Sequence, residues 1–119
     1  MADIDKITAS NGTTYNIKDS TARESIYRAL DGGDLNNVFA PGFYYIAGNA
    51  PSNVPDDGTM TYTHMLVIGN AVNPASSAAV CTQILFKTGS SVSNIYVRNY
   101  SGSPRSWSSW KKFTGSALA

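Results

Sequence analysis

Short runs of alternating apolar and polar residues dominate the chain from Asp34 onward, and Gly, Pro, Ser and Asn separate them. Alternation with a period of two is typical of strands that bury one face. The run at residues 65–68 is continuously apolar, which predicts a central strand covered on both faces. The pattern predicts five strands, at about Gly42–Ala47, Tyr62–Gly69, Ala79–Lys87, Asn94–Asn99 and Trp107–Phe113.

The clearest pair of extended runs lies between Ile95 and Phe113. Residues 95–100 are rich in aromatic and β-branched side chains, which pack well on a pleated surface. The turn Ser101-Gly102-Ser103-Pro104 interrupts the pattern, because Gly tolerates positive φ and Pro lacks the N–H of a central strand. Both tryptophans follow this turn, so we expect a hairpin whose second arm carries Trp107 and Trp110.

The first 33 residues carry a different pattern. Asn11-Gly12 separates the extended runs Ile4–Ser10 and Thr13–Lys18, and this dipeptide between such runs is a strong hairpin signal. The next segment, about Thr21–Leu30, has the spacing of a helix. Thr21 and Glu24 fit a capping box, and Gly32-Gly33 follows as a stop signal.

One narrow apolar stripe runs along the expected helix, with Ala22, Ile26 and Leu30 spaced four residues apart. A helix this short is marginal alone and gains stability by packing. We expect the stripe, together with Ile17 of the hairpin, to join copies of the chain in a homo-oligomer, and a trimer is the preferred form. The alternative is that the helix covers one end of the following domain within a single subunit.

These patterns predict a mainly β protein: a small antiparallel β sandwich or knob, preceded by a β-hairpin and one short helix. We expect residues 1–33 to form an oligomerisation or attachment unit and residues 34–119 to form the β-rich domain. Large aromatic side chains dominate protein cores, so Phe43, Phe86 and Trp110 are expected in the core.

Charged residues make up only 14% of the chain, against a usual value of about 25%. Residues 1–57 hold all eight acidic residues, whereas residues 58–119 hold five basic residues and no acid. The basic half could face an anionic partner such as a phosphate-bearing surface polymer. The alternative is that these charges solvate strand faces and discourage edge pairing. We expect no nucleic-acid partner, because no Lys/Arg cluster or groove-reading helix is evident.

The sequence offers few candidates for catalysis. Asp56-Asp57 precedes Gly58 in an expected turn, where aspartates usually cap their own backbone. Cys81 and His64 are the single cysteine and histidine, and they lie in apolar strands where core packing explains them more simply than a nucleophilic pair. We therefore expect no enzyme, no cofactor and no metal site. A lone cysteine also forms no disulfide within the chain.

No run of 18 apolar residues and no charged-then-apolar leader is present, so we expect no membrane insertion and no signal peptide.

Binding is better supported than catalysis. Tyr96, Arg98 and Tyr100 alternate on one face of an expected strand, and basic and aromatic side chains follow the turn. Aromatic rings offer flat apolar area, and arginine adds a planar fork of donors, a combination that suits sugars. The alternative is that most of these rings belong to the core. The candidate ligand-binding residues are Tyr96, Arg98, Tyr100, Arg105, Trp107 and Lys111.

Several of these segments, taken in order, resemble the pyocin-knob domain of phage tail fibres and pyocins over residues 34–114. The resemblance is carried by Asp34-Leu35-Asn36, Pro41-Gly42, Phe43-Tyr44-Tyr45-Ile46, Cys81-Thr82-Gln83-Ile84, Ile95-Tyr96-Val97-Arg98 and the closing Trp107-Ser108-Ser109-Trp110-Lys111-Lys112. Residues 14–23 also resemble a stretch found near the start of phage tail and fibre proteins.

The resemblance implies a virion component, made in a host cytoplasm, that takes part in attachment to a host-surface glycan as a trimeric fibre or spike. Residues 1–33 would then contact other virion proteins. The first alternative is a structural decoration or head-fibre protein that binds no receptor. The second is a carbohydrate-active enzyme, for which the basic half of the chain lacks the paired acids.

Overall fold

The structure is a computed structural model that describes residues 6–16, 27–71, 73–88 and 93–118. Strands make up 48% of it, and the described residues form almost no helix, so the predicted mainly β fold is confirmed. The described elements are β1 (Lys6–Thr8), β2 (Thr14–Asn16), β3 (Tyr27–Leu30), the 3-10 turn η1 (Leu35–Asn37), β4 (Gly42–Ile46), β5 (His64–Gly69), β6 (Val80–Thr88), β7 (Ser93–Gly102), β8 (Arg105–Trp107) and β9 (Lys111–Thr114).

The predicted N-terminal hairpin is confirmed. Strands β1 and β2 pair antiparallel, with Thr8 opposite Thr14, in a two-stranded sheet of their own. Gly12 takes a φ of 86°, and the Asn11 side chain accepts a hydrogen bond from the Thr13 N–H at 2.9 Å. The Asn-Gly dipeptide thus makes the turn because both residues suit its backbone.

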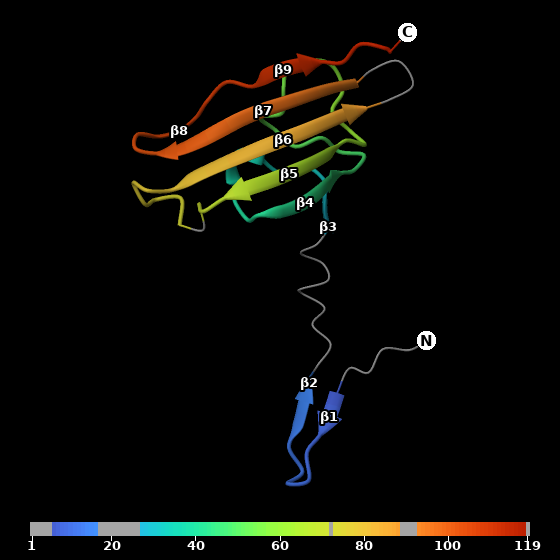
Figure 1. Ribbon diagram of the computed structural model, residues 1–119, viewed down its shortest axis with the longest axis vertical. Coiled ribbons are helices and arrows are strands. Elements are labelled where there is room, and N and C mark those ends of the chain that lie inside the picture. The colour runs from blue at the N-terminus through green and yellow to red at the C-terminus, as the bar shows by residue number, and fades with distance from the viewer. Residues whose placement is uncertain (1–5, 17–26, 72, 89–92, 119) are drawn as a thin grey trace.

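The remaining seven strands form one sheet in the order β3-β4-β5-β6-β7-β8, with β9 also paired to β7 (Figure 1). All pairs are antiparallel except β3 and β4, which run parallel. The sandwich prediction is corrected here, because the strands lie in a single mixed sheet rather than in two packed sheets. The expected strand 107–113 is divided into β8 and β9, since residues 108–110 leave the ladder.

The helix predicted over Thr21–Leu30 is wrong at its C-terminal end. Residues 27–30 form β3, and Leu30 lies opposite Ile46 and packs against the core. Pairing with β4 supplies backbone partners and apolar contacts, which outweigh the weak local helix propensity of a short segment. The sheet therefore starts before the domain boundary predicted at Gly33. Ile17, Ala22 and Ile26, the other proposed oligomerisation residues, lie outside the described residues.

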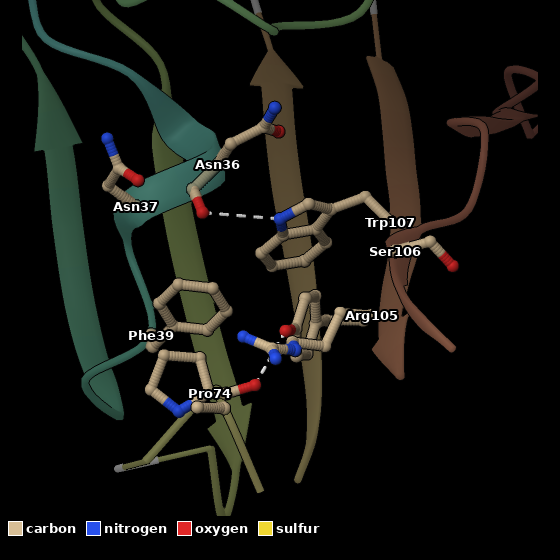
Figure 2. A pocket seen from close by; sticks show the side chains of 9 residues that line it. Asn36, Asn37, Phe39, Pro74, Arg105, Ser106 and Trp107 are labelled. Carbon is tan, nitrogen blue, oxygen red and sulfur yellow. Dashed lines mark hydrogen bonds between the residues drawn. The ribbon is translucent and has the colours of Figure 1, made fainter. Parts of the chain in front are cut away.

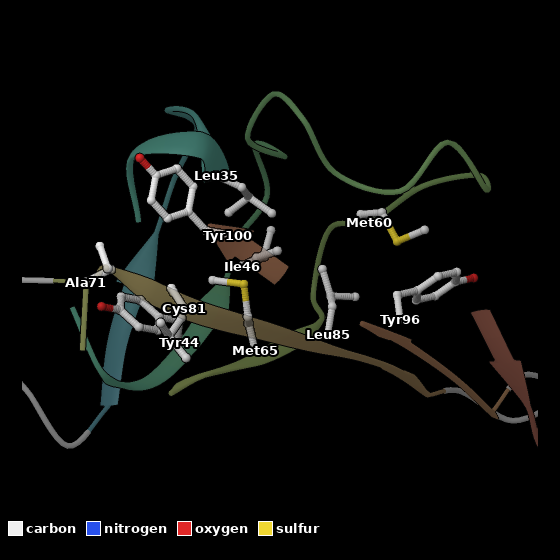
Figure 3. Close-up of a cluster of buried hydrophobic side chains, with 12 residues drawn as sticks. Leu35, Tyr44, Ile46, Met60, Met65, Ala71, Cys81, Leu85, Tyr96 and Tyr100 are labelled. Atoms are coloured by element: carbon white, nitrogen blue, oxygen red, sulfur yellow. The ribbon is translucent and has the colours of Figure 1, made fainter. Parts of the chain in front are cut away.

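One face of the seven-stranded sheet, here called the covered face, carries the core. Alternate residues of β7 are buried, and they lie opposite buried residues of β6 and β5 in register. Leu35 and Met60 reach this face from the loops on either side of β4 (Figure 3). The buried apolar cluster comprises Leu35, Tyr44, Ile46, Met60, Met65, Val67, Ala71, Ala79, Cys81, Leu85, Tyr96 and Tyr100.

The opposite face, here called the open face, is apolar but largely exposed. The expected core position of Phe43 is wrong, because alternation along β4 turns Tyr44 and Ile46 inward and leaves Phe43 52% exposed. The prediction for β5 is also corrected, since Ile68 is exposed and only one face of that strand is covered. The open face carries Tyr27, Phe43, Tyr45, His64, Leu66, Ile68, Val80, Thr82, Ile84, Phe86, Ile95, Val97, Asn99, Lys111 and Phe113.

Candidate functional site

A surface pocket of about 580 Å³ opens on the covered side of the sheet, where η1, the loop after β5 and the β7–β8 hairpin meet. Figure 2 shows Phe39, Pro74, Arg105 and Trp107 grouped around this opening, whereas the Ser106 side chain points away from them. It combines aromatic rings with amide, hydroxyl and guanidinium groups. Its lining is Asn36, Asn37, Phe39, Pro74, Ala75, Tyr100, Arg105, Ser106 and Trp107.

Three aromatic rings form the wall of this pocket. The ring of Phe39 stacks on Trp107 with centroids 5.5 Å apart, and it meets Tyr100 edge-on at 4.9 Å. Tyr100 and Trp107 lie opposite each other in the β7–β8 ladder, with ring centroids 5.2 Å apart. Such contacts stabilise aromatic pairs beyond their area alone, so the wall is held rigidly.

Hydrogen bonds to the backbone fix the orientation of two of these rings (Figure 2). The Trp107 indole N–H donates to the carbonyl of Asn36 at 3.2 Å, and the Tyr100 hydroxyl donates to the carbonyl of Pro74 at 2.7 Å. The polar atoms of both rings are therefore already engaged. What they offer to a ligand is mainly apolar ring surface, while polar recognition falls to Asn37 and Arg105, which are exposed at the rim.

Arg98 lies behind the pocket wall rather than in the pocket. Its guanidinium stacks between two indoles, with its central carbon 4.1 Å from the centroid of Trp107 and 4.6 Å from that of Trp110. The Arg98 side chain is buried, and this lowers its pKa to about 10, because desolvation disfavours the charged form. The spacing of the two tryptophans thus allows both indole rings to contact the same buried guanidinium.

The buried side chain of Gln83 connects Arg98 to the turn that forms the pocket. Its amide donates to the carbonyls of Leu35 at 2.8 Å and Val38 at 2.9 Å, and its oxygen accepts from the Arg98 Nε at 2.9 Å. Arg98 Nη1 donates in turn to the Asn36 side chain at 2.9 Å. This network holds η1 against the sheet, and with it the Asn36–Phe39 side of the pocket.

Asp34 forms the N-terminal cap of the same turn. Its carboxylate accepts hydrogen bonds from the Asn53 side chain at 2.6 Å and from the Asn36 N–H at 2.8 Å. These bonds lower the pKa of Asp34 below its ordinary value of 3.8. The cap explains why an Asp-Leu-Asn sequence folds into a turn at this point.

The third side of the pocket depends on a close backbone approach at Gly102. A Cβ at this position would lie 1.9 Å from the carbonyl oxygen of Ser76, which is far inside contact distance. The Gly102 N–H also donates to the carbonyl of Ala79 at 2.9 Å. Glycine is therefore required for the loop that carries Pro74 and Ala75 to lie against the β7–β8 hairpin.

Three of the six predicted ligand-binding residues meet in this pocket: Tyr100, Arg105 and Trp107. The predicted alternation of Tyr96, Arg98 and Tyr100 is observed, but all three point to the covered face and are buried. Lys111 lies on the open face, opposite Val97 in the ladder.

Tyr96 belongs to a separate contact. Its hydroxyl donates to the carboxylate of Asp57, which also pairs with Lys112 at 2.8 Å. The hydrogen bond from Lys112, which has the larger effect, and the one from Tyr96 lower the pKa of Asp57 below its ordinary value of 3.8. The contact joins the loop after β4 to β7 and β9.

Sequence reasoning missed the side of the pocket formed by Asn36, Asn37, Phe39 and Pro74. The turn signal of Asp34 and the two asparagines was visible, but it carries no information on which strand end the turn will cover. Only the tertiary contacts of Gln83, far along the chain, place it beside Trp107.

The candidate catalytic pairs do not assemble. Cys81 is buried on the covered face, and burial raises the pKa of its thiol, whereas His64 lies on the open face. Asp57 is occupied by Tyr96 and Lys112. Among the described residues there is no cluster of His, Cys, Asp or Glu that could hold a metal ion.

No helix in the described part of the chain is long and apolar enough to cross a membrane.

Comparison with known proteins adds no assignment: no family model, curated protein or solved structure matches this chain.

Proposed function

We propose that this protein is a non-enzymatic component of a phage or phage-like particle that takes part in attachment to a glycan of the host surface. The observation that carries glycan binding is the pocket beside the β7–β8 hairpin, where rigid aromatic rings lie next to exposed amide and guanidinium groups. The resemblance of residues 34–114 to the pyocin-knob domain supports the particle and the host surface as its setting.

The geometry favours a sugar over other small ligands. A sugar ring presents an apolar face of C–H groups and a rim of hydroxyls, and the pocket presents ring surface from Phe39 and Trp107 beside the polar groups of Asn37 and Arg105. Arginine adds affinity for an acidic sugar or a phosphate-bearing one, because its planar fork donates two parallel hydrogen bonds.

Binding of the purified protein to an array of bacterial surface polysaccharides tests the proposal. We expect saturable binding to one class of glycan, accompanied by a change in tryptophan fluorescence because Trp107 lines the pocket. Arg105→Ala should weaken this binding about tenfold or more, since a hydrogen bond to a charged group contributes roughly 1.5–3 kcal/mol. Lys111→Ala is the matched control, because it removes one exposed cation from the other face of the sheet.

Two outcomes would count against the proposal. Equal losses from Arg105→Ala and Lys111→Ala would show that general charge rather than the pocket attracts the polymer. Binding to assembled particles without binding to any surface glycan would favour a structural decoration protein instead.

A further inference from the structure

The open face of the sheet is unusual for a face that meets only water. Its most exposed apolar side chains spread over six neighbouring strands. They are Tyr27 on β3, Phe43 on β4, Ile68 on β5, Val80 on β6, Ile95 on β7 and Phe113 on β9. Because the strands are adjacent and in register, these side chains form one continuous surface. No described segment of the chain packs over it.

Charge is nearly absent from this surface. The titratable side chains on it are Tyr27 and Tyr45, whose rings stack with centroids 6.3 Å apart, His64, and Lys111 at one edge. An ordinary solvated sheet face alternates apolar inward residues with polar outward ones, whereas β5 is apolar on both faces from Met65 to Ile68. Strand β5 therefore has the apolar composition that is expected of a strand with both faces covered.

The exposed area is of the size that a stable protein contact needs. Taking about 100 Å² for a half-exposed aromatic side chain and about half of that for an aliphatic one, the open face offers roughly 450 Å² of apolar surface. An apolar patch of this size is about the largest that a typical monomeric protein exposes, and such a patch is often functional. Contact with surrounding polar atoms would bring it close to the roughly 800 Å² that each partner buries in a standard interface.

We propose that the open face packs against the corresponding face of another copy of this chain. A second copy fits this surface, because its own apolar face of equal area needs cover and both surfaces lack acidic groups that would demand a basic partner. Sheets pack face to face at about 10 Å, so two copies would complete between them the sandwich that one chain does not form.

Edge-to-edge association is less suited to this chain. Strand β9 lies at the edge beside β7 and carries Lys111 and Lys112 next to each other, and charged edge residues discourage pairing with another strand. An apolar depression of about 330 Å³ between Phe86, Ile95 and Phe113 instead gives the face a recess that a side chain of the neighbouring copy can fill.

Light scattering coupled to size-exclusion chromatography of the full chain tests the proposal. The single chain has a mass of 12.7 kDa, and we expect at least twice this value. Phe43→Lys and, independently, Ile95→Lys should return the mass to that of one chain, because each places an unpaired charge inside the contact. Leu118→Lys is the matched control, since Leu118 is an exposed apolar residue outside the sheet, and its mass should stay that of the wild type.

Each outcome of this experiment either supports or overturns the proposed contact between copies. Circular dichroism and thermal unfolding identify a variant that has lost its fold, and the two open-face positions lie on different strands, so one remains informative if the other misfolds. A wild-type protein that stays a single chain at its highest soluble concentration would overturn the proposal. So would an assembly that survives both variants, as expected if residues 1–33 alone hold the copies together. Glycan binding by the monomeric variants would leave the proposed function intact, because the pocket lies on the covered side.

Discussion

The two faces of the seven-stranded sheet are built from the same strands but differ in the groups that they bury and expose. The covered face buries polar groups such as Gln83 and Arg98, which are held by hydrogen bonds within the chain, and only Arg98 Nη2 is left without a partner among the described residues. The open face exposes apolar groups such as Phe43 and Phe113 and offers them no partner among the described residues. The difference shows that strand alternation sets two surfaces at once, and that the described residues cover only one of them.

The largest effect is expected from Gln83, which joins the turn η1 to the sheet. Gln83→Leu would remove three hydrogen bonds and leave the Arg98 Nε and the Val38 carbonyl unsatisfied, whereas the Leu35 carbonyl keeps its bond from the Val38 N–H. Each such group costs about 1–3 kcal/mol, so we expect the free energy of unfolding to fall by about 3 kcal/mol or more. Denaturant titration measures this loss.

Thr82→Val is the control for that substitution. Thr82 is the neighbouring residue on the open face, and its hydroxyl bonds only the Asn99 side chain at the surface. A loss of less than about 1 kcal/mol is expected, because that hydrogen bond is accessible to water. Equal losses for the two variants would contradict the view that the polar network stabilises the covered face.

A smaller effect is expected from Gly102→Ala, which tests the contact between the pocket loop and the β7–β8 hairpin. The added Cβ would force Ser76 and its loop away from the strand, with a cost of about 1–3 kcal/mol typical of overpacking. Glycan binding should fall as well, because Pro74 and Ala75 line the pocket. Thermal unfolding and the binding titration measure the two effects together.

Gly48→Ala serves as the comparison. A Cβ there meets only the ring end of Tyr62, which is exposed and free to move. We expect wild-type stability and binding. A strong loss at Gly48, or none at Gly102, would show that the close approach is not what holds the loop.

Acid is expected to weaken the contact that joins Asp57 to Lys112 and Tyr96. The pKa of Asp57 is lower in the folded chain than its ordinary value of 3.8, so the stabilisation is present above that value and is lost as the pH falls through the folded pKa. Unfolding midpoints between pH 6 and pH 2 should therefore drop more for the wild type than for Asp57→Asn. Parallel curves would rule out this contribution.

The smallest effect on stability is expected on the open face. Phe43→Thr places a β-branched residue with good strand propensity at this position and removes a ring that is half exposed in the single chain. Under conditions that keep the chain monomeric, we expect the free energy of unfolding to change by less than about 1 kcal/mol. A much larger loss would mean that the ring is covered within the chain, and the contrast between the faces would fail.

The sequence was sufficient to predict the mainly β fold and its N-terminal hairpin, because period-two alternation and Asn-Gly act locally. Three of the six residues predicted to bind a ligand, Tyr100, Arg105 and Trp107, line one pocket because a single hairpin carries them. It did not reveal that Arg98 is buried between two tryptophans, which requires residues 107–110 to fold back across β7. The capping signals predict a helix that includes Leu30 because they act locally, whereas the pairing of Leu30 with β4 depends on residues far along the chain.

Whether the covered side carries the binding site can be tested by mapping ligand-induced amide and indole chemical shifts in a labelled sample of the full chain. With a surface glycan selected from the array, we predict that the largest shifts occur at the Trp107 indole and at Asn37, Ala75 and Arg105. Shifts concentrated on Phe43, Ile95 and Phe113, or no saturable shifts with any bacterial surface glycan, would contradict the account.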